Sequence, residues 1–175
     1  MSTVFSEKQI REATKRVAEQ INNDYKGQQI HFLGVLKGSF IFLADLVRHI
    51  QVPCTVDFVR LSSYGGGTVS RGAVDEVTAR KDPVRGRHVL VVEEIVDTGL
   101  TLSKLLADVA AERPRSLKVC TLVDKTGARR VEIPVAYRGF VLDEGFLVGY
   151  GLDLDERYRN LPEIRLWTGG GQEDP

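Results

Sequence analysis

The amino-acid sequence predicts one α/β domain: a mostly parallel central sheet flanked by helices. Helix-like and strand-like segments alternate through the middle of the chain. The strand-like segments 30–36, 88–92 and 117–123 are almost continuously apolar, which is typical of strands buried on both faces. The length of 175 residues suits a single domain. In open sheets of this kind, ligands bind at the carboxyl ends of the strands.

The first predicted helix begins after Ser6. Ser6 and Gln9 have the spacing of a capping box, in which each side chain bonds the backbone of the other residue. Apolar residues follow at helical spacing from Ile10 to Ile21, and Gly27 ends the segment.

Two strands and a second helix follow. The strand 30–36 leads into a turn at Lys37-Gly38, after which a helix is predicted from residue 39 to about residue 50. Pro53 then starts an extended run, 54–61, that is rich in β-branched and aromatic residues.

Residues 62–82 differ in composition from the rest of the chain. Four glycines lie among serines and threonines, and apolar periodicity is weak. A stretch of about 20 residues with this composition inside a compact domain predicts a functional lid or a mobile hairpin.

The second half continues the alternation. It predicts a strand at 88–92, an amphipathic helix at 100–112 and a buried strand at 117–123. Shorter strands are expected around 136–141 and 146–149. No internal repeat is present.

Composition excludes several classes of protein. Lys and Arg number 24, as do Asp and Glu, so the formal net charge is zero, which argues against a general nucleic-acid or anionic-membrane binder. No apolar run approaches the ~18 residues of a membrane helix. Charged residues at positions 7, 8 and 11 do not fit a signal peptide. We therefore expect a cytoplasmic protein.

The two cysteines, Cys54 and Cys120, both lie in strand-like apolar runs. They form no C-x-x-C motif, and we interpret them as two buried reduced thiols, with a disulfide as the alternative. The three histidines are scattered, which does not favour a histidine metal site.

The most informative segment is 89–102, VLVVEEIVDTGLTL. An apolar strand brings Glu93 and Glu94 to its carboxyl end, and 97–101 then turns into a helix. The turn suits an anion, because a glycine, two threonine hydroxyls and the free N–H groups of a helix start lie together. The paired carboxylates instead suit hydroxyl donors or Mg²⁺. A phosphorylated sugar has both kinds of group.

This segment resembles the phosphoribosyl-pyrophosphate signature of the type I phosphoribosyltransferases. Four further segments resemble the hypoxanthine(-guanine) phosphoribosyltransferases, in the order of that family: LKGSF at 36–40, SSYG at 62–65, DKTGARR at 124–130 and FLVGYGLDLDERYRNLPEI at 146–164. The resemblance covers the chain from about residue 10 to residue 164.

The resemblance implies an enzyme of purine salvage that transfers the 5-phosphoribosyl group of phosphoribosyl pyrophosphate to hypoxanthine or guanine, giving IMP or GMP and pyrophosphate. It also implies Mg²⁺ as cofactor, small-molecule substrates only, and a homodimer or homotetramer. The fold would carry a small hood made by the N-terminal and C-terminal segments, and a flexible lid loop at about 62–82.

The resemblance also assigns the site residues. Asp97 would be the general acid/base, and the metal would be held by Glu93, Glu94 and Asp153. The purine would be bound by Lys125, Phe146, Leu147 and Asp153. Phosphoribosyl pyrophosphate would be bound by Leu36, Lys37, Gly38, Ser63, Tyr64, Glu93, Glu94, Asp97, Thr98, Gly99, Leu100, Thr101 and Arg159.

Some alternatives remain open. On composition alone, Phe146 would be a core aromatic, and Arg159 with Asp153 an ordinary surface pair. Glu94 stands where the family usually has Asp, and Leu147 where Val is common. The same fold also occurs in RNA-binding regulators of pyrimidine operons and in transferases that prefer xanthine or adenine.

Overall fold

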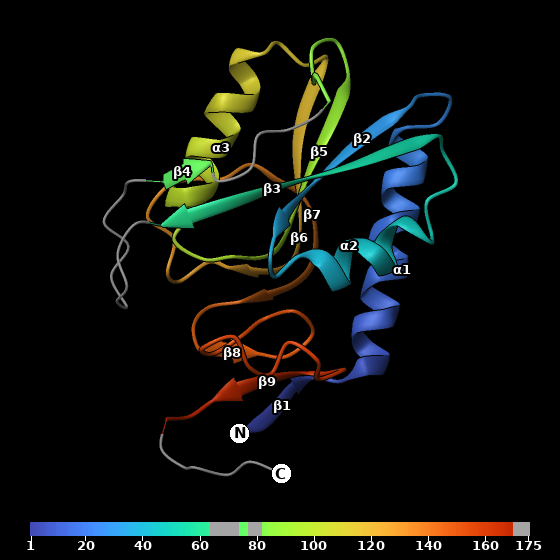
Figure 1. The fold of residues 1–175 in the computed structure, drawn as a ribbon. Coiled ribbons are helices and arrows are strands. Elements are labelled where there is room, and N and C mark those ends of the chain that lie inside the picture. The colour runs from blue at the N-terminus through green and yellow to red at the C-terminus, as the bar shows by residue number, and fades with distance from the viewer. Residues whose placement is uncertain (64–73, 77–81, 170–175) are drawn as a thin grey trace.

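The computed structural model describes residues 1–63, 74–76 and 82–169 (Figure 1). Its large sheet has the strand order β4-β3-β2-β5-β6-β7. These strands are β2 (Ile30–Leu36), β3 (Cys54–Ser63), β4 (Val74–Glu76), β5 (His88–Val96), β6 (Ser116–Lys125) and β7 (Val135–Leu142). All neighbours are parallel except the short β4, which pairs antiparallel with the end of β3. The predicted α/β class with a mostly parallel sheet is confirmed.

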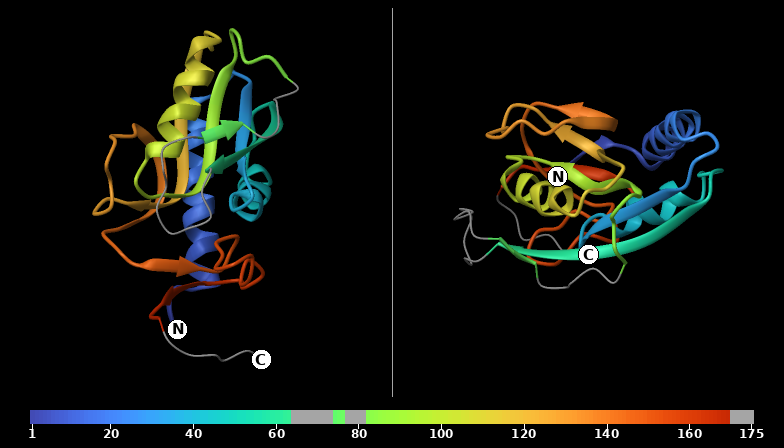
Figure 2. Two further views of the ribbon diagram at one scale, coloured as in Figure 1. Left: turned by 60° about the vertical axis from the view of Figure 1, so that its left-hand side comes forward. Right: turned by 90° about the horizontal axis from the view of Figure 1, so that it is seen from above.

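Three helices cover the large sheet: α1 (Glu7–Asp24), α2 (Phe40–Val47) and α3 (Leu100–Ala111). Figures 1 and 2 show α3 on one side of the sheet and α1 with α2 on the other. Alternation along β5 explains this arrangement, because successive side chains of a strand point to opposite faces. Leu90 and Val92 pack towards α1 and α2, whereas Val89 and Val91 pack towards α3. Both faces are therefore core, as the apolar strands predicted.

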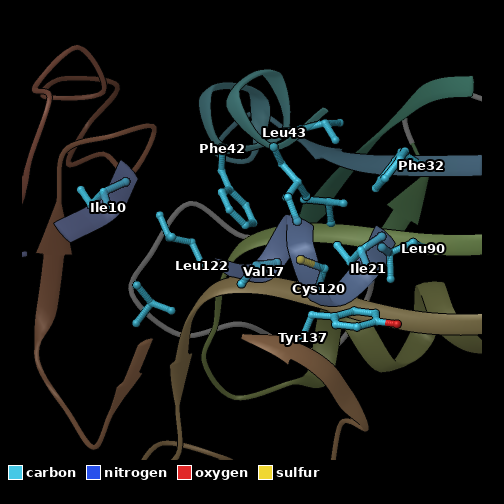
Figure 3. Packing of buried hydrophobic residues seen from close by; sticks show 14 of the residues in the cluster. Ile10, Val17, Ile21, Phe32, Phe42, Leu43, Leu90, Cys120, Leu122 and Tyr137 are labelled. Carbon is cyan, nitrogen blue, oxygen red and sulfur yellow. The ribbon is translucent and has the colours of Figure 1, made fainter. Parts of the chain in front are cut away.

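Figure 3 shows the larger core. Val17 and Ile21 from α1 and Phe42 from α2 lie over the sheet residues Phe32 and Leu90. All five side chains are fully buried. Because helices and strands that are distant in sequence share this cluster, it fixes where the strands end in space.

The predicted capping box at the start of α1 is confirmed. The Gln9 side chain accepts a hydrogen bond from the Ser6 backbone N–H at 2.9 Å, and Ser6 Oγ accepts one from the Gln9 N–H at 3.4 Å. The second helix is shorter than predicted and ends at Val47. The N–H of Ile50 bonds the carbonyl of Val47, three residues back, which makes a tight turn ahead of Pro53.

A second, small sheet lies below the large one in Figure 1. It has the order β1-β9-β8, from β1 (Ser2–Phe5), β9 (Ile164–Trp167) and β8 (Phe146–Val148). The register pairs Ser2 with Leu166, so the start of the chain lies beside its C-terminal part. Strands β1 and β9 were not predicted, because segments of four residues carry too little periodicity.

The prediction of two buried thiols is wrong for one cysteine. Both thiols are free, and Cys120 is buried, but Cys54 is exposed. Cys54 pairs with β2 on one side, whereas β4 covers only the far end of β3. The start of β3 is therefore an open edge. Of the described helices, none is both long and apolar enough to span a membrane.

Candidate active site

The predicted site residues lie mainly at the carboxyl ends of β2, β5 and β6, and in the segment between β8 and β9. The register pairs Val96, the last residue of β5, with Asp124 of β6. The residues that follow these two, Asp97 and Lys125, should therefore be neighbours. They are: Lys125 Nζ lies 3.0 Å from Asp97 Oδ2. Lys125 is buried, with 8% of its surface exposed. A mostly buried lysine side chain therefore pairs with an aspartate whose side chain is 47% exposed.

Asp97 leaves part of its carboxylate available for another partner. Its Oδ1 atom is buried and has no hydrogen-bond partner among the described residues. Buried polar atoms are nearly always hydrogen-bonded in native proteins, so such an atom at a surface hollow indicates a place where a ligand donates.

Arg129 holds the backbone of this loop and was not assigned a role from the sequence. Its Nε donates to the carbonyl oxygen of Asp97 at 3.0 Å, and a terminal nitrogen donates to that of Val96 at 3.2 Å. The same guanidinium pairs with the buried carboxylate of Asp124, which Arg138 also contacts at 3.0 Å. The sequence signal was only the DKTGARR segment, in which Asp124 and Arg129 are five positions apart.

The turn after Asp97 has the local geometry that the predicted anion cradle requires. Gly99 caps α3 with a left-handed φ of 81°, and a Cβ there would lie 2.7 Å from the carbonyl oxygen of Val131. Only glycine fits this position. The N–H of Leu100 bonds Thr98 Oγ1 at 3.4 Å. A hollow of 220 Å³ opens here, lined by Glu93, Ile95, Val96, Asp97, Thr98, Gly99, Thr101 and Leu102. Free N–H groups of the first helical turn face such a hollow, together with the positive end of the helix dipole.

The expectation that Glu93 and Glu94 follow the end of a strand is corrected. Strand β5 continues to Val96, so both glutamates lie within it and their side chains point to opposite faces of the sheet. Burial, together with the charge of Glu94, raises the pKa of Glu93 well above its usual value. Burial is the main cause that raises the pKa of Glu94 to about 7. A hydrogen bond from the Glu94 backbone and the charge of Arg159 lower this pKa, whereas the charge of Asp153 raises it.

Gly38 lies directly against Glu94. A Cβ on Gly38 would meet a carboxylate oxygen of Glu94 at 1.8 Å and could not be accommodated. On the other side, Gly151 approaches the same loop, since its Cβ would lie 2.1 Å from the carbonyl oxygen of Gly38. The Leu36–Lys37 peptide bond in this loop is cis. Gly38 therefore lies between the Glu94 side chain and the backbone at Gly151.

Charged side chains connect the loop after β2 with the segment after β8. Arg159 lies 2.7 Å from Asp153 and donates to the carbonyl oxygen of Gly151, also at 2.7 Å. Lys37 Nζ contacts Glu156 at 2.8 Å, and Arg159 contacts the same carboxylate at 3.4 Å. Arg159 and Asp153 are therefore part of a network that ties the loop after β2 to the segment after β8. Glu156 was not predicted, because nothing in its sequence neighbourhood separates it from other surface carboxylates.

The carboxylates fit a hard cation that arrives with a substrate. Oε2 of Glu94 is buried without a hydrogen-bond partner in the described ranges, as is Nε of Arg159. No group of three or more His, Cys, Asp or Glu side chains in the described part of the chain is arranged to hold a metal by itself. Mg²⁺ commonly binds through one or two carboxylates plus substrate phosphates, so this donor set fits that ion.

Phe146 is not a core aromatic, because 49% of its surface is exposed. It begins β8, four residues after Leu142, which is the register partner of Lys125. The neighbouring Leu147 is buried. For the predicted lid, the side chain of Ser63 and all of Tyr64 lie outside the described residues, as does most of 62–82.

Comparison with known proteins gives a consistent result. The family described as "Phosphoribosyl transferase domain" matches residues 2–155. The hypoxanthine phosphoribosyltransferase of Salmonella typhimurium is 40% identical, over 94% of this chain and 93% of the relative. The hypoxanthine-guanine phosphoribosyltransferase of Streptococcus pneumoniae is 46% identical, over 92% of this chain and 89% of the relative.

Solved structures agree with these relatives. A hypoxanthine-guanine phosphoribosyltransferase from Bacillus anthracis superposes with a TM-score of 0.91 at 43% identity, covering 96% of this chain and 99% of the other. The hypoxanthine phosphoribosyl transferase of Trypanosoma cruzi gives a TM-score of 0.89 at 40% identity, covering 95% and 90%.

Proposed function

The chain belongs to the phosphoribosyl transferase family, among the hypoxanthine(-guanine) phosphoribosyltransferases, and on this basis we propose the following reaction. The enzyme transfers the 5-phosphoribosyl group of phosphoribosyl pyrophosphate to a 6-oxopurine, hypoxanthine or guanine. A bond forms between C1 of the ribose and N9 of the purine, and the bond to pyrophosphate breaks. The products are IMP or GMP and pyrophosphate, as in purine salvage.

The contact between Lys125 and Asp97 is the observation that carries this proposal. Asp97 is the general acid/base: its carboxylate shares the purine proton near N7 while the bond at N9 forms. Lys125 has only donors, so it reads the 6-oxo oxygen of the base. The contact places the two groups 3.0 Å apart, within the span of one purine edge.

The rest of the base site comes from the small sheet and the segment after it. The exposed ring of Phe146 stacks on the purine, and the backbone of the buried Leu147 meets its far edge. Asp153 completes this edge while its carboxylate remains paired with Arg159.

Phosphoribosyl pyrophosphate occupies both halves of the site. Its 5-phosphate binds the cradle of Thr98, Gly99, Leu100 and Thr101, where helix-start N–H groups favour an anion. Pyrophosphate binds the loop of Leu36, Lys37 and Gly38 together with Arg159. Glu93 and Glu94 bind the ribose hydroxyls.

Mg²⁺ would be held by Glu94 together with substrate oxygens, with Asp153 close to a second ion. Glu93, which points to the opposite face of β5, would support the first ion only through the ribose hydroxyls that it binds. When bound, Mg²⁺ neutralises the charge that grows on the departing pyrophosphate. Arg159 supplies a fixed positive charge to the same group.

The proposal also includes a lid, a cellular location and an assembly. Ser63 and Tyr64 belong to a lid that closes over pyrophosphate and excludes water from the oxocarbenium-like centre. With this lid, Tyr64→Ala should lower kcat/KM and raise the share of turnover lost to hydrolysis.

The enzyme is also proposed to act in the cytoplasm. Its proposed assembly is a homodimer or homotetramer, and light scattering would measure the number of subunits.

Pyrophosphate release with four bases in parallel tests the function. We expect turnover with hypoxanthine or guanine, and about 10⁴-fold lower kcat/KM with adenine, because its 6-amino group cannot accept from Lys125. Adenine used within tenfold of hypoxanthine would contradict the role of Lys125. Xanthine as the best substrate would change the base assignment, and turnover with no base would overturn the reaction.

A further inference from the structure

A second, larger cavity lies at the opposite end of the large sheet. Its volume is 660 Å³, within the range of small-molecule sites. It is formed where β2 and β5 begin and where the chain enters β6, at the top of Figure 1. The lining residues are Gly27, Gln28, Gln29, Ile30, His31, Gly86, Arg87, His88 and Arg115. The active-site residues lie at the other ends of these strands; along β5, His88 and Val96 are about 26 Å apart at ~3.3 Å per residue.

The charge of this cavity has one sign. Two of its nine lining residues are arginines and two are histidines, and none of the nine is acidic. Arg115 is exposed and forms no ion pair with a carboxylate in the ranges that the structure describes. Among the described residues, Arg87 pairs with one carboxylate, that of the exposed Asp82, at 3.8 Å. The zero net charge of the chain is therefore unevenly distributed, with a local excess of positive charge here.

Neutral groups contribute to holding the Arg87 and His88 side chains in place. Arg87 donates to Thr55 Oγ1 at 3.1 Å and to the carbonyl oxygen of Pro83 at 3.3 Å. His88 Nδ1 lies 2.7 Å from Ser116 Oγ, and Tyr25 packs against the imidazole edge-on with ring centroids 5.6 Å apart. Arg87 has only the exposed Asp82 as a carboxylate partner among the described residues, and Arg115 has none, so much of the positive charge of the two guanidinium groups remains available to a ligand.

His88 lies close to positively charged side chains. Burial lowers the pKa of His88, and the positive charges of Arg115 and Lys118 lower it further. Positive charges therefore converge on the ring. Lys118 itself contacts Tyr137 and Asp24 and lies over the ring of Tyr25.

Glycines keep the rim open. Gly27 and Gly86 have φ values of 75° and 71°, and a Cβ at either position would meet no atom within 4 Å. Each glycine is the third residue of a tight turn, and both are exposed at the mouth of the cavity.

We propose that this cavity binds a small phosphate-bearing anion, at a site separate from the active site. Guanidinium groups match phosphate oxygens with paired N–H donors, and an imidazole and two glutamine amides add shorter-range donors. A cavity of this volume accommodates an anion with two or three phosphate groups and leaves room for an organic portion. The site does not depend on the proposed reaction, since it shares no residue with the active site.

Binding would be mapped by NMR with inorganic tripolyphosphate as the probe, on the full chain, with sodium chloride matching the ionic strength. We expect saturable shifts of the backbone amides of Gly27 and Gly86 and of the His88 ring. A bound anion favours the imidazolium form, so the pKa of His88 should rise on binding. Shifts confined to residues 97–101 would overturn the proposal, because the probe would then bind only the active site.

Variants separate this site from general charge attraction. Arg115→Gln and Arg87→Gln should each weaken tripolyphosphate binding at this cavity about tenfold, the effect of one charge-assisted hydrogen bond. The control Arg48→Gln removes an exposed arginine that follows α2 and does not line the cavity, and it should leave the affinity unchanged. Equal weakening in all three variants would overturn the site, since only total charge would then matter. Arg115→Gln alters an exposed side chain, so its fold should be preserved and its result is decisive.

Discussion

Arg129 binds the main chain of Asp97, whereas Lys125 binds its side chain. The guanidinium donates to the Asp97 carbonyl oxygen at 3.0 Å, and the ammonium lies 3.0 Å from Oδ2. The proposed acid/base is thus held at both ends by positively charged groups from the strand β6 and the turn after it. A fixed carboxylate loses less entropy when the base binds.

Arg129→Gln should lower kcat by about 10²-fold, since small displacements of a catalytic group have effects of that order. KM for phosphoribosyl pyrophosphate should change less, because the cradle at 98–101 is retained. Arg138→Gln is the matched control: it removes the other arginine on Asp124 but no contact to Asp97. Equal loss of kcat in both variants would show that Arg129 acts only by balancing the charge of Asp124.

Asp97→Asn should lower kcat by about 10²–10⁴-fold, because the amide keeps the shape but cannot accept the purine proton. Binding of phosphoribosyl pyrophosphate, measured by calorimetry, should remain within a few-fold of the unmodified enzyme. Thr98 and Thr101, which we propose to bind its 5-phosphate, are not altered. An unchanged kcat would place the proton chemistry on another group.

Gly38→Ala should abolish most activity, because the new methyl group would occupy the position of the Glu94 carboxylate, 1.8 Å from Oε1. The second change Glu94→Asp should restore part of it, since the shorter side chain withdraws the carboxylate by about one methylene. The single variant Glu94→Asp is the control. If the double variant is no more active than Gly38→Ala alone, the close approach of these two residues does not limit activity.

The stability of the metal-free protein should depend on pH through Glu94. Burial is the main cause that raises its pKa from the ordinary value of 4.5 to about 7 in the folded protein. Between these values the folded state holds a proton that the unfolded state has released. The free energy of unfolding should therefore fall as pH rises from about 5 to 7.

Thermal unfolding from pH 5 to 8 would measure this dependence. Glu94→Gln should make this dependence shallower and leave the part that the buried Glu93 contributes, whereas the exposed Glu144→Gln should leave it unchanged. Mg²⁺ with phosphoribosyl pyrophosphate should stabilise the protein more at pH 8 than at pH 6, because protons compete with the metal for the carboxylate. A rise in stability of the metal-free protein with pH would contradict the raised pKa.

The sequence by itself determined the fold class and the conformation of the turn at 97–101. Continuous apolar strands require helices on both faces of a sheet, and the capping box set the start of α1. The cradle at 97–101 is local in sequence, and Gly99 adopts the left-handed φ that its turn requires. Local features of this kind follow from neighbouring residues, so they can be predicted without the rest of the chain.

The tertiary structure alone decided the contacts between distant segments. Arg129 meets Asp97 across 32 positions, Lys37 meets Glu156 across 119, and β1 pairs with β9 across almost the whole chain. Periodicity and spacing carry no information about such pairs. The protonation of Glu94 and the exposure of Cys54 are also tertiary properties, because the pKa of a carboxyl group and the burial of a thiol depend on which segments pack around them.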